Sequence, residues 1–289
     1  MDAKITRFIS FRKAGQESFG VWTDDGVIDL SSRSGHATLK EAIAAGALDE
    51  LAALAAGVQT PDHARDAIQL LPVIPQPGKI LCVGLNYHDH VAETGRELTV
   101  NPALFVRFPE SQVAHGDPIL VPAISEKLDY EGELALVIGK GGRNIAEADA
   151  LAHVAGYACY NDGSVRDWQY HTTQFTAGKN FVGTGAFGPW LIPASEIGDV
   201  GSLRLETRLN GTVMQSATVD MMITPIARQI AYISTFTPLA PGDVIITGTP
   251  GGVGAKRNPP VFLKPGDLIE VEVDRIGVLS NRVMAETAA

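Results

Sequence analysis

Residues 129–139 read Asp129-Tyr130-Glu131-Gly132-Glu133-Leu134-Ala135-Leu136-Val137-Ile138-Gly139. The second half of this stretch is almost wholly apolar, which is typical of a buried strand. Because side chains alternate along a strand, Glu131 and Glu133 are expected on one face, a few ångströms apart. The two carboxylates are therefore expected at the start of a buried strand.

Two neighbouring carboxylates repel each other in a low dielectric unless a cation, a proton or a base neutralises them. A hard divalent ion such as Mg²⁺ does this well, since it takes oxygen ligands and keeps positions open for water and substrate. The alternative is an exposed strand edge on which Glu131 and Glu133 are simply solvated.

Working outward, the sequence is dominated by short strands with frequent glycine and proline, and helices are few. Such a texture favours a β-rich α+β fold over a regular βαβ alternation. The dipeptide Asn210-Gly211 predicts a hairpin turn. Strands are predicted at 134–139, 154–160, 203–209, 243–248 and 268–273, and helices at 146–152 and 224–235.

The N-terminal part has a different pattern. A strand is predicted at 4–11, and Asp24-Asp25-Gly26 marks a hairpin between 19–22 and 27–30. Leucines and isoleucine at helical spacing predict a helix over 38–56. Three prolines within 71–78 can continue neither a helix nor a central strand and therefore indicate a linker. These signals predict a small α/β domain at 1–72 and a larger domain at 78–289.

Composition narrows the classes of function. The chain has 289 residues with 45% hydrophobic and 19% charged residues, enough for a sizeable core. Its net charge of -10 argues against nucleic acid or an anionic membrane as the main partner. Cys82 and Cys159 lie in apolar surroundings and predict neither a disulfide framework nor a zinc site. With no signal peptide pattern at the N-terminus and no apolar run long enough to span a bilayer, a cytoplasmic protein is expected.

Three further groups of residues could carry chemistry. His90 and Glu93 are three residues apart, so on a helical turn the carboxylate can orient the imidazole as a general base. Asp162 follows an apolar strand and could supply a third oxygen ligand. Arg166 and Gln169 share a helical face, and each group also has a plain structural interpretation, such as a surface histidine beside a glutamate or a helix cap.

A glycine-rich turn follows the strand predicted at 243–248. Its backbone N–H groups and the Thr249 hydroxyl could hold an anion. The turn resembles neither a Walker loop nor the dinucleotide fingerprint, so nucleotide binding is not supported.

The order of these motifs resembles the fumarylacetoacetate hydrolase family over roughly residues 78–283. The resemblance implies a mixed β-roll catalytic domain, a small variable N-terminal domain, a homodimer and a site for Mg²⁺, Mn²⁺ or Ca²⁺. Two positions depart from the family pattern, namely Arg107, where many relatives carry lysine, and the small Gly163. The motifs are Gly84 to Glu93, Asp129 to Gly139, Asn161 to Gln169, Gly178-Lys179 and Thr247 to Pro250.

The same resemblance implies roles for individual residues. Glu131, Glu133 and Asp162 match the metal ligands. His90 and Glu93 match the base dyad on a segment that closes over substrate, and Lys179 and Gln169 match groups that stabilise an oxyanion. Arg166, Thr249 and Tyr87 match substrate-binding positions.

The expected function is metal-dependent hydrolysis of a C–C bond in a 2,4-dioxo acid, such as fumarylpyruvate or maleylpyruvate, to release pyruvate. An oxaloacetate decarboxylase or an isomerase/decarboxylase of aromatic catabolism is the alternative, because the enolate of the same 2-oxo acid would serve decarboxylation and tautomerisation. A non-catalytic β-rich module that binds Ca²⁺ is a third possibility from a different class.

Overall fold

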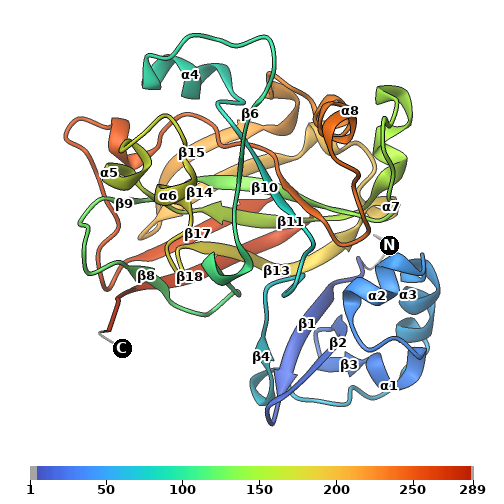
Figure 1. Ribbon diagram of the computed structural model, residues 1–289. Helices are drawn as coiled ribbons and strands as arrows, with labels where there is room; N and C mark the ends of the chain where they lie inside the picture. The colour runs from blue at the N-terminus through green and yellow to red at the C-terminus, as the bar shows by residue number, and fades with distance from the viewer. Residues whose placement is uncertain (1–4, 288–289) are drawn as a thin grey trace.

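A large mixed sheet forms the centre of the protein in the computed structural model, which describes residues 5–287 (Figure 1). Its order is β3-β2-β1-β13-β11-β10-β16-β5-β6, with β4 beside β1 and β7 beside β13. The β16–β5 and β13–β7 pairs are parallel, whereas β10 and β11 pair antiparallel. The strands are β1 (Phe8–Lys13), β2 (Gln16–Trp22), β3 (Val27–Asp29), β4 (Gln69–Leu70), β5 (Ile80–Gly84), β6 (Ala103–Val106), β7 (Gln112–Val113), β10 (Gly132–Ile138), β11 (Val154–Asp162), β13 (Gly185–Pro193) and β16 (Val244–Ile246).

A second sheet has the order β15-β14-β17-β18-β8. Asn210 and Gly211 both have positive φ, 52° and 79°, and form the tight turn between β14 and β15. The predicted hairpin is therefore confirmed. Alternate residues of β14 and β17 are buried, as expected for strands with one face on the core. The strands are β8 (Ile119–Val121), β14 (Arg204–Leu209), β15 (Thr212–Thr218), β17 (Leu268–Val273) and β18 (Gly277–Ala285), and a separate short pair joins β9 (Leu128–Asp129) to β12 (Ser164–Val165).

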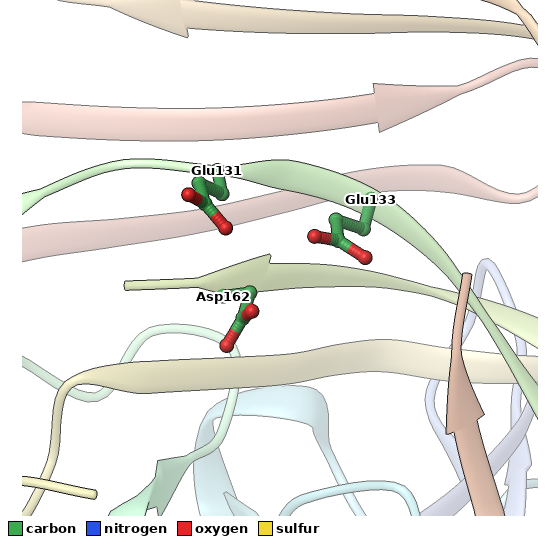
Figure 2. Close-up of side chains that lie close together, drawn as sticks. All are labelled: Glu131, Glu133 and Asp162. Atoms are coloured by element: carbon green, nitrogen blue, oxygen red, sulfur yellow. The ribbon is translucent and has the colours of Figure 1, made fainter. Parts of the chain in front are cut away.

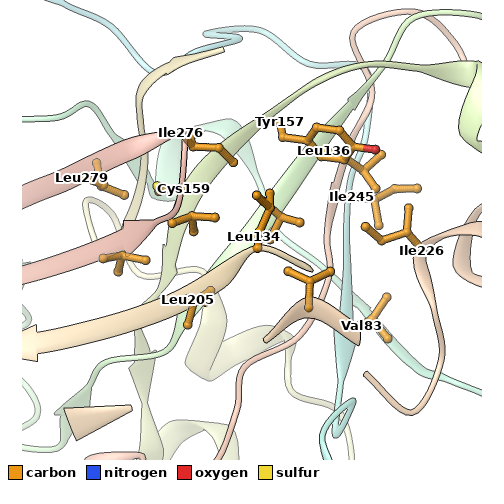
Figure 3. Packing of buried hydrophobic residues seen from close by; sticks show 14 of the residues in the cluster. Val83, Leu134, Leu136, Tyr157, Cys159, Leu205, Ile226, Ile245, Ile276 and Leu279 are labelled. Atoms are coloured by element: carbon orange, nitrogen blue, oxygen red, sulfur yellow. The ribbon is translucent and has the colours of Figure 1, made fainter. Parts of the chain in front are cut away.

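Strand β10 is buried at every position because both of its faces are covered. Leu134 and Leu136 point into a cluster with Leu205 and Leu279 of the second sheet and with Ile226 (Figure 3). Ala135 and Val137, on the opposite face, pack in a cluster with apolar residues of the N-terminal region. This two-sided burial explains the continuous apolar run, and the predicted β-rich α+β class is confirmed.

Helices are short, at most 11 residues long in the described part of the chain. The region predicted as one helix at 38–56 forms two, α2 (Leu39–Ala44) and α3 (Leu48–Ala56), because Gly46 between them adopts a left-handed φ of 69°, a conformation that ends helices. The remaining helices are α1 (Ser31–Ser34), α4 (His88–Thr94), α5 (Arg166–Gln169), α6 (Thr176–Lys179), α7 (Ala194–Ile197) and α8 (Ile226–Phe236), with 3₁₀ turns η1 (Arg65–Ala67), η2 (Pro109–Ser111), η3 (Glu147–His153), η4 (Val200–Ser202), η5 (Val219–Met221) and η6 (Gly254–Lys256).

The N-terminal region is seen as a distinct lobe in Figure 1, in which β1–β3 pack with α1–α3. Its strand β1 also pairs with β13 through Phe8 and Leu191, so the sheet continues from this lobe into the rest of the protein. The predicted division into domains at 1–72 and 78–289 stays a prediction. The strand predicted at 4–11 begins at Phe8, and residue 4 lies outside the described residues.

Both cysteines are buried and free, as predicted. Within residues 5–287, no helix combines the length and apolar character that crossing a bilayer requires.

Candidate active site

Three carboxylates converge where β10 and β11 lie side by side. Glu131 directly precedes β10, Glu133 lies within it, and Asp162 ends β11. Figure 2 shows Glu131 and Glu133 projecting from one segment towards Asp162 on the neighbouring strand. One carboxylate oxygen from each residue lies within 4.8 Å of the other two, and all three residues are buried. The structure therefore brings the predicted metal ligands together.

The strand pairing positions these groups. The antiparallel register places Glu133 opposite Tyr160 and Gly132 opposite Asn161. The Asp162 N–H donates to the Glu131 carbonyl at 2.8 Å, and the Glu131 N–H donates to Asn161 Oδ1 at 3.0 Å. These bonds continue the ladder to the end of β11, so Glu131 and Asp162 come together although 31 positions separate them in the sequence.

Buried cations surround the three acids. Lys179 Nζ lies 2.6 Å from Glu131 Oε2 and 2.6 Å from Asp162 Oδ2. Arg166 Nη1 lies 2.7 Å from Glu131 Oε1, and Arg166 Nη2 lies 2.7 Å from Asp129 Oδ2. Within the described residues, the polar partner of Glu133 is the Gly248 N–H, which donates to it. The cations thus neutralise Glu131, Asp162 and Asp129 but not Glu133.

The pKa values of Glu131 and Glu133 shift in opposite directions for this reason. Burial raises the pKa of Glu131, but Lys179 and Arg166 outweigh that effect and lower the pKa to about 2. Burial and the charges of Asp162 and Glu131 raise the pKa of Glu133 well above its ordinary value. A site made only of oxygen donors with excess negative charge fits a hard divalent cation such as Mg²⁺ or Mn²⁺, held by Glu131, Glu133 and Asp162.

The predicted base dyad forms on α4. His90 Nδ1 and Glu93 Oε1 are 2.7 Å apart, and Glu93 Oε2 accepts a hydrogen bond from the Gly252 N–H at 2.9 Å. A carboxylate can only accept, so in the neutral ring Nδ1 carries the hydrogen and Nε2 keeps its lone pair. The bond from Gly252 ties α4 to the glycine-rich turn after β16. Both His90 and Glu133 line the cavity above the acidic cluster.

Other predicted residues are engaged with protein groups. Arg166 Nη1 donates to Gln169 Oε1 at 2.9 Å, and both residues line the cavity. The Thr249 hydroxyl donates to the Gly132 carbonyl at 2.9 Å and accepts from Gln215 Nε2 at 2.7 Å, while Thr249 also lines the cavity. The side chain of Thr249 is therefore already used to hold the turn.

Tyr87 lies elsewhere. It is 2% exposed, belongs to the hydrophobic core and is not among the residues that line the cavity. Burial raises the pKa of its hydroxyl, as expected for a phenol inside the protein. Its position gives no support to the predicted role in substrate binding, because the apolar packing that precedes α4 directs the ring into the core.

Comparison with known proteins identifies the family of this chain. Residues 79–284 match the family described as fumarylacetoacetate (FAA) hydrolase C-terminal. The chain belongs to the fumarylacetoacetate hydrolase family. The matched region starts just after the proline-rich segment at 71–78, and the resemblance found from the sequence motifs is confirmed.

Several relatives and solved structures are similar to this family member. The mitochondrial oxaloacetate tautomerase fahd2 of Xenopus laevis is 43% identical over 76% of this chain and 70% of its own length. The oxaloacetate tautomerase YisK of Bacillus subtilis is 42% identical over 75% of this chain and 73% of its own length.

The solved structures cover more of the chain. The fumarylacetoacetate hydrolase of Exiguobacterium antarcticum has a TM-score of 0.83 at 34% identity, covering 97% of this chain and 100% of its own. The maleylpyruvate hydrolase of Sphingobium sp. SYK-6, solved with manganese(II) and pyruvate, has a TM-score of 0.80 at 27% identity over 97% of this chain and 100% of its own.

Within this family framework, the two departures noted in the sequence have structural explanations. Arg107 is buried and donates to Asp162 Oδ1 at 2.6 Å, so it serves as a fixed cation behind a predicted metal ligand. At Gly163 an added Cβ would lie 2.0 Å from the Thr184 carbonyl oxygen, which leaves room for no side chain.

Sequence reasoning missed the buried partners of the site. Asp129 accepts from Arg166 and from the N–H groups of Gly254 and Ala255. Gln215 accepts from the Gly132 N–H at 2.9 Å and donates to Thr249. The position of Asp129, two residues before Glu131, could have indicated that its carboxylate belongs to the site. Gln215 lies in strand β15, and nothing in the sequence around it indicates a role in the site.

Proposed function

We propose that this protein is a divalent-metal-dependent tautomerase that interconverts the keto and enol forms of oxaloacetate or a closely related 2-oxo acid. The observation that carries the proposal is a histidine–glutamate base dyad whose His90 lines the same cavity as Glu131 and Glu133, two members of a buried cluster of three carboxylates. The names of the relatives support it, since the proteins at 40–43% identity with assigned activities are called oxaloacetate tautomerases. This proposal replaces C–C hydrolysis, the main expectation from the sequence, with a reaction close to its alternative.

The metal is proposed to be Mg²⁺ or Mn²⁺, held by Glu131, Glu133 and Asp162. When bound, such an ion would supply Lewis-acid polarisation of the 2-oxo group and a template for the adjacent carboxylate. A divalent cation would favour the ionised form of Glu133, which pairs with no basic side chain within the described residues and whose pKa burial and the neighbouring carboxylates raise.

The proton transfer is assigned to His90. In the keto form, Nε2 takes a proton from C3, and the electron pair of that C–H bond becomes the C2=C3 double bond while charge moves to the 2-oxo oxygen. The imidazolium then returns the proton to that oxygen, so no proton is gained or lost overall. Glu93 supports this cycle because its carboxylate holds the Nδ1 hydrogen and stabilises the positive ring.

The developing negative charge on the oxygen needs a donor near the ligands. Lys179 and Arg166 are buried, charged and line the cavity beside the acids. Gln169 can add a neutral donor, since its oxygen already accepts from Arg166. One preorganised donor of this type is worth about 3–4 kcal/mol of transition-state stabilisation.

A three-way assay tests the proposal. Enol-oxaloacetate is added to the Mg²⁺- or Mn²⁺-loaded protein, and loss of enol absorbance is followed together with pyruvate release. A tautomerase accelerates enol loss without releasing pyruvate, whereas a decarboxylase releases pyruvate from oxaloacetate. A hydrolase releases pyruvate only when an acylpyruvate is supplied in a parallel reaction. Enol loss at the uncatalysed rate with the metal-loaded protein rejects the tautomerase, and catalysed enol loss that EDTA leaves unchanged rejects its dependence on the metal.

Acylpyruvate hydrolysis remains the second candidate. The maleylpyruvate hydrolase structure, which contains manganese(II) and pyruvate, supports it at 27% identity. In this reaction His90 would take a proton from water rather than from C3, so the same dyad serves both chemistries. Pyruvate release from maleylpyruvate at a rate exceeding enol turnover would establish the hydrolase instead.

A homodimer in the cytoplasm is also proposed, without nucleic acid or membrane partners. Ile124, Val182 and Met284, which lie near β8 and β18, are exposed by 65%, 61% and 52%. Exposed apolar side chains of this kind support self-association. The net charge of -10 supports the absence of polyanionic partners. Sedimentation velocity at low concentration measures the oligomeric state, and a single monomer species contradicts the dimer.

A further inference from the structure

Two cations at the outer part of the cavity have no role in the chemistry above. Arg96 follows α4, and Lys256 ends η6, yet both line the same cavity as His90 and Glu131. Both residues are exposed. Over residues 5–287, neither side chain forms an ion pair, unlike the buried Arg166 and Lys179.

An aromatic wall connects the outer cation to the inner ones. The Arg96 guanidinium lies 4.9 Å from the centre of the Phe175 ring. Phe175 packs edge-on against Phe105 with ring centres 5.8 Å apart, and the Lys179 ammonium lies 4.8 Å from the centre of the Phe105 ring. A cation on an aromatic face is held in place while its N–H groups remain available. The wall therefore runs from the acidic cluster to Arg96.

The charge pattern of the cavity points to a ligand with two anionic ends. The inner cations, Arg166 and Lys179, form ion pairs with Glu131, Asp162 and Asp129. A bound divalent ion would add positive charge beside them. The outer cations have no ion-pair partner in the part of the chain that the structure describes, although the whole chain carries a net charge of -10. Unpaired cations at the mouth of a cavity attract and orient an anionic group.

We propose that Arg96 and Lys256 form a subsite for a second carboxylate, so that the site selects 2-oxo dicarboxylates over 2-oxo monocarboxylates. The inference rests on the proposed function for the placement of the 2-oxo acid end at the acidic cluster. Arg96 would reach the distal carboxylate from the segment that follows α4, and Lys256 from the end of η6. Both act as specificity-determining residues, since neither touches the atoms that exchange protons.

Binding measured without turnover tests the subsite. Isothermal titration of the Mn²⁺-loaded protein compares 2-oxoglutarate with 2-oxopentanoate, which has the same chain length but a methyl group in place of the distal carboxylate. The wild type is expected to bind the dicarboxylate more tightly. Arg96→Gln and Lys256→Gln should each weaken 2-oxoglutarate binding by about two- to fivefold, as expected for exposed charge pairs, and leave 2-oxopentanoate binding unchanged.

Matched controls separate a local subsite from the overall field of the protein. Arg282→Gln and Lys264→Gln remove the same charges from exposed positions outside this cavity, and should leave both affinities unchanged. Equal wild-type affinity for the two ligands, or equal losses for both ligands in the Arg96 and Lys256 variants, overturns the subsite.

Failure of the proposed function looks different from failure of the subsite. If the wild type prefers 2-oxoglutarate and the variants lose this preference, the subsite stands even when oxaloacetate is not tautomerised. If oxaloacetate is tautomerised, the Arg96 and Lys256 variants should raise KM with little change in kcat. Tautomerisation with an unchanged KM in both variants refutes the subsite and leaves the proposed function intact.

Discussion

Arg107 Nη1 lies 2.6 Å from Asp162 Oδ1, and both side chains are fully buried. The same guanidinium donates to the Gly163 carbonyl at 2.9 Å, to Thr184 Oγ1 at 3.0 Å and to Ser111 Oγ at 3.1 Å. The acceptors of its hydrogen bonds thus lie on three segments of the chain. This arrangement fixes Asp162 from behind, while its other carboxylate oxygen accepts from Lys179.

Replacing Arg107 with methionine should lower the free energy of unfolding by about 3 kcal/mol, because Asp162 loses a buried partner. This is the low end of the usual cost of breaking a buried ion pair, since Lys179 still pairs with Asp162. The matched control is Arg12→Met, which breaks an ion pair of the same 2.6 Å length to Glu17 at an exposed position. That change should cost less than about 1 kcal/mol. Urea denaturation of both variants checks the contrast, and equal losses contradict it.

Replacing Glu133 with glutamine should separate metal binding from folding. The carboxylate is buried beside two other acids without a cation of its own, so the neutral isostere removes repulsion and should not destabilise the metal-free protein. Mn²⁺ affinity should fall by about 100-fold or more, since a direct ligand matters at least as much as its supporting groups. Titration calorimetry and thermal unfolding measure the two effects. The exposed Glu147→Gln should change neither.

Changes in the base dyad should affect turnover but not the metal. His90→Ala should lower kcat by about 10²–10⁴-fold, the usual contribution of a general base. Glu93→Gln should have a smaller effect in the same direction, because the amide still holds the ring but no longer stabilises its positive charge. Mn²⁺ affinity should stay within about twofold of the wild type. An unchanged kcat in His90→Ala would remove His90 from the mechanism.

Stability should depend on pH through His115, which is not among the residues that line the cavity. The ring is half-buried, its Nδ1 accepts from the Ser280 N–H at 3.1 Å, and burial lowers its pKa below the ordinary 6.5. As pH falls, the unfolded chain takes up a proton at this position before the folded protein does. The unfolding free energy should therefore decrease between about pH 7.5 and 5.5.

The variant His115→Gln isolates this contribution. It lacks the titrating ring, so its unfolding free energy should fall less steeply with pH over the same interval. His88→Gln, at an exposed histidine, should keep the wild-type slope. Urea denaturation at several pH values gives the three slopes. A His115→Gln slope equal to that of the wild type shows that other groups cause the dependence.

Local features of the structure were predictable from the sequence. The alternation of side chains places Glu131 and Glu133 on one face of the segment that enters β10, and the three-residue spacing places His90 beside Glu93 on α4. Asn210-Gly211 adopts the turn its conformational freedom favours. The break between α2 and α3 also depends on a local feature, since Gly46 between them adopts a left-handed φ. Each of these depends on neighbours within a few residues.

The buried electrostatics of the site depended on the tertiary structure. Arg107 and Asp162 are separated by 55 positions, Asp129 and Arg166 by 37, and no periodicity links either pair. Tyr87 lies in the core rather than in the cavity, because the packing before α4 decides where its ring points. The amino-acid sequence alone determined which candidate oxygen ligands and which candidate base are present. Only the pairing of β10 with β11 decided that the ligands meet at one place, since strand register follows from the burial of whole faces rather than from any single residue.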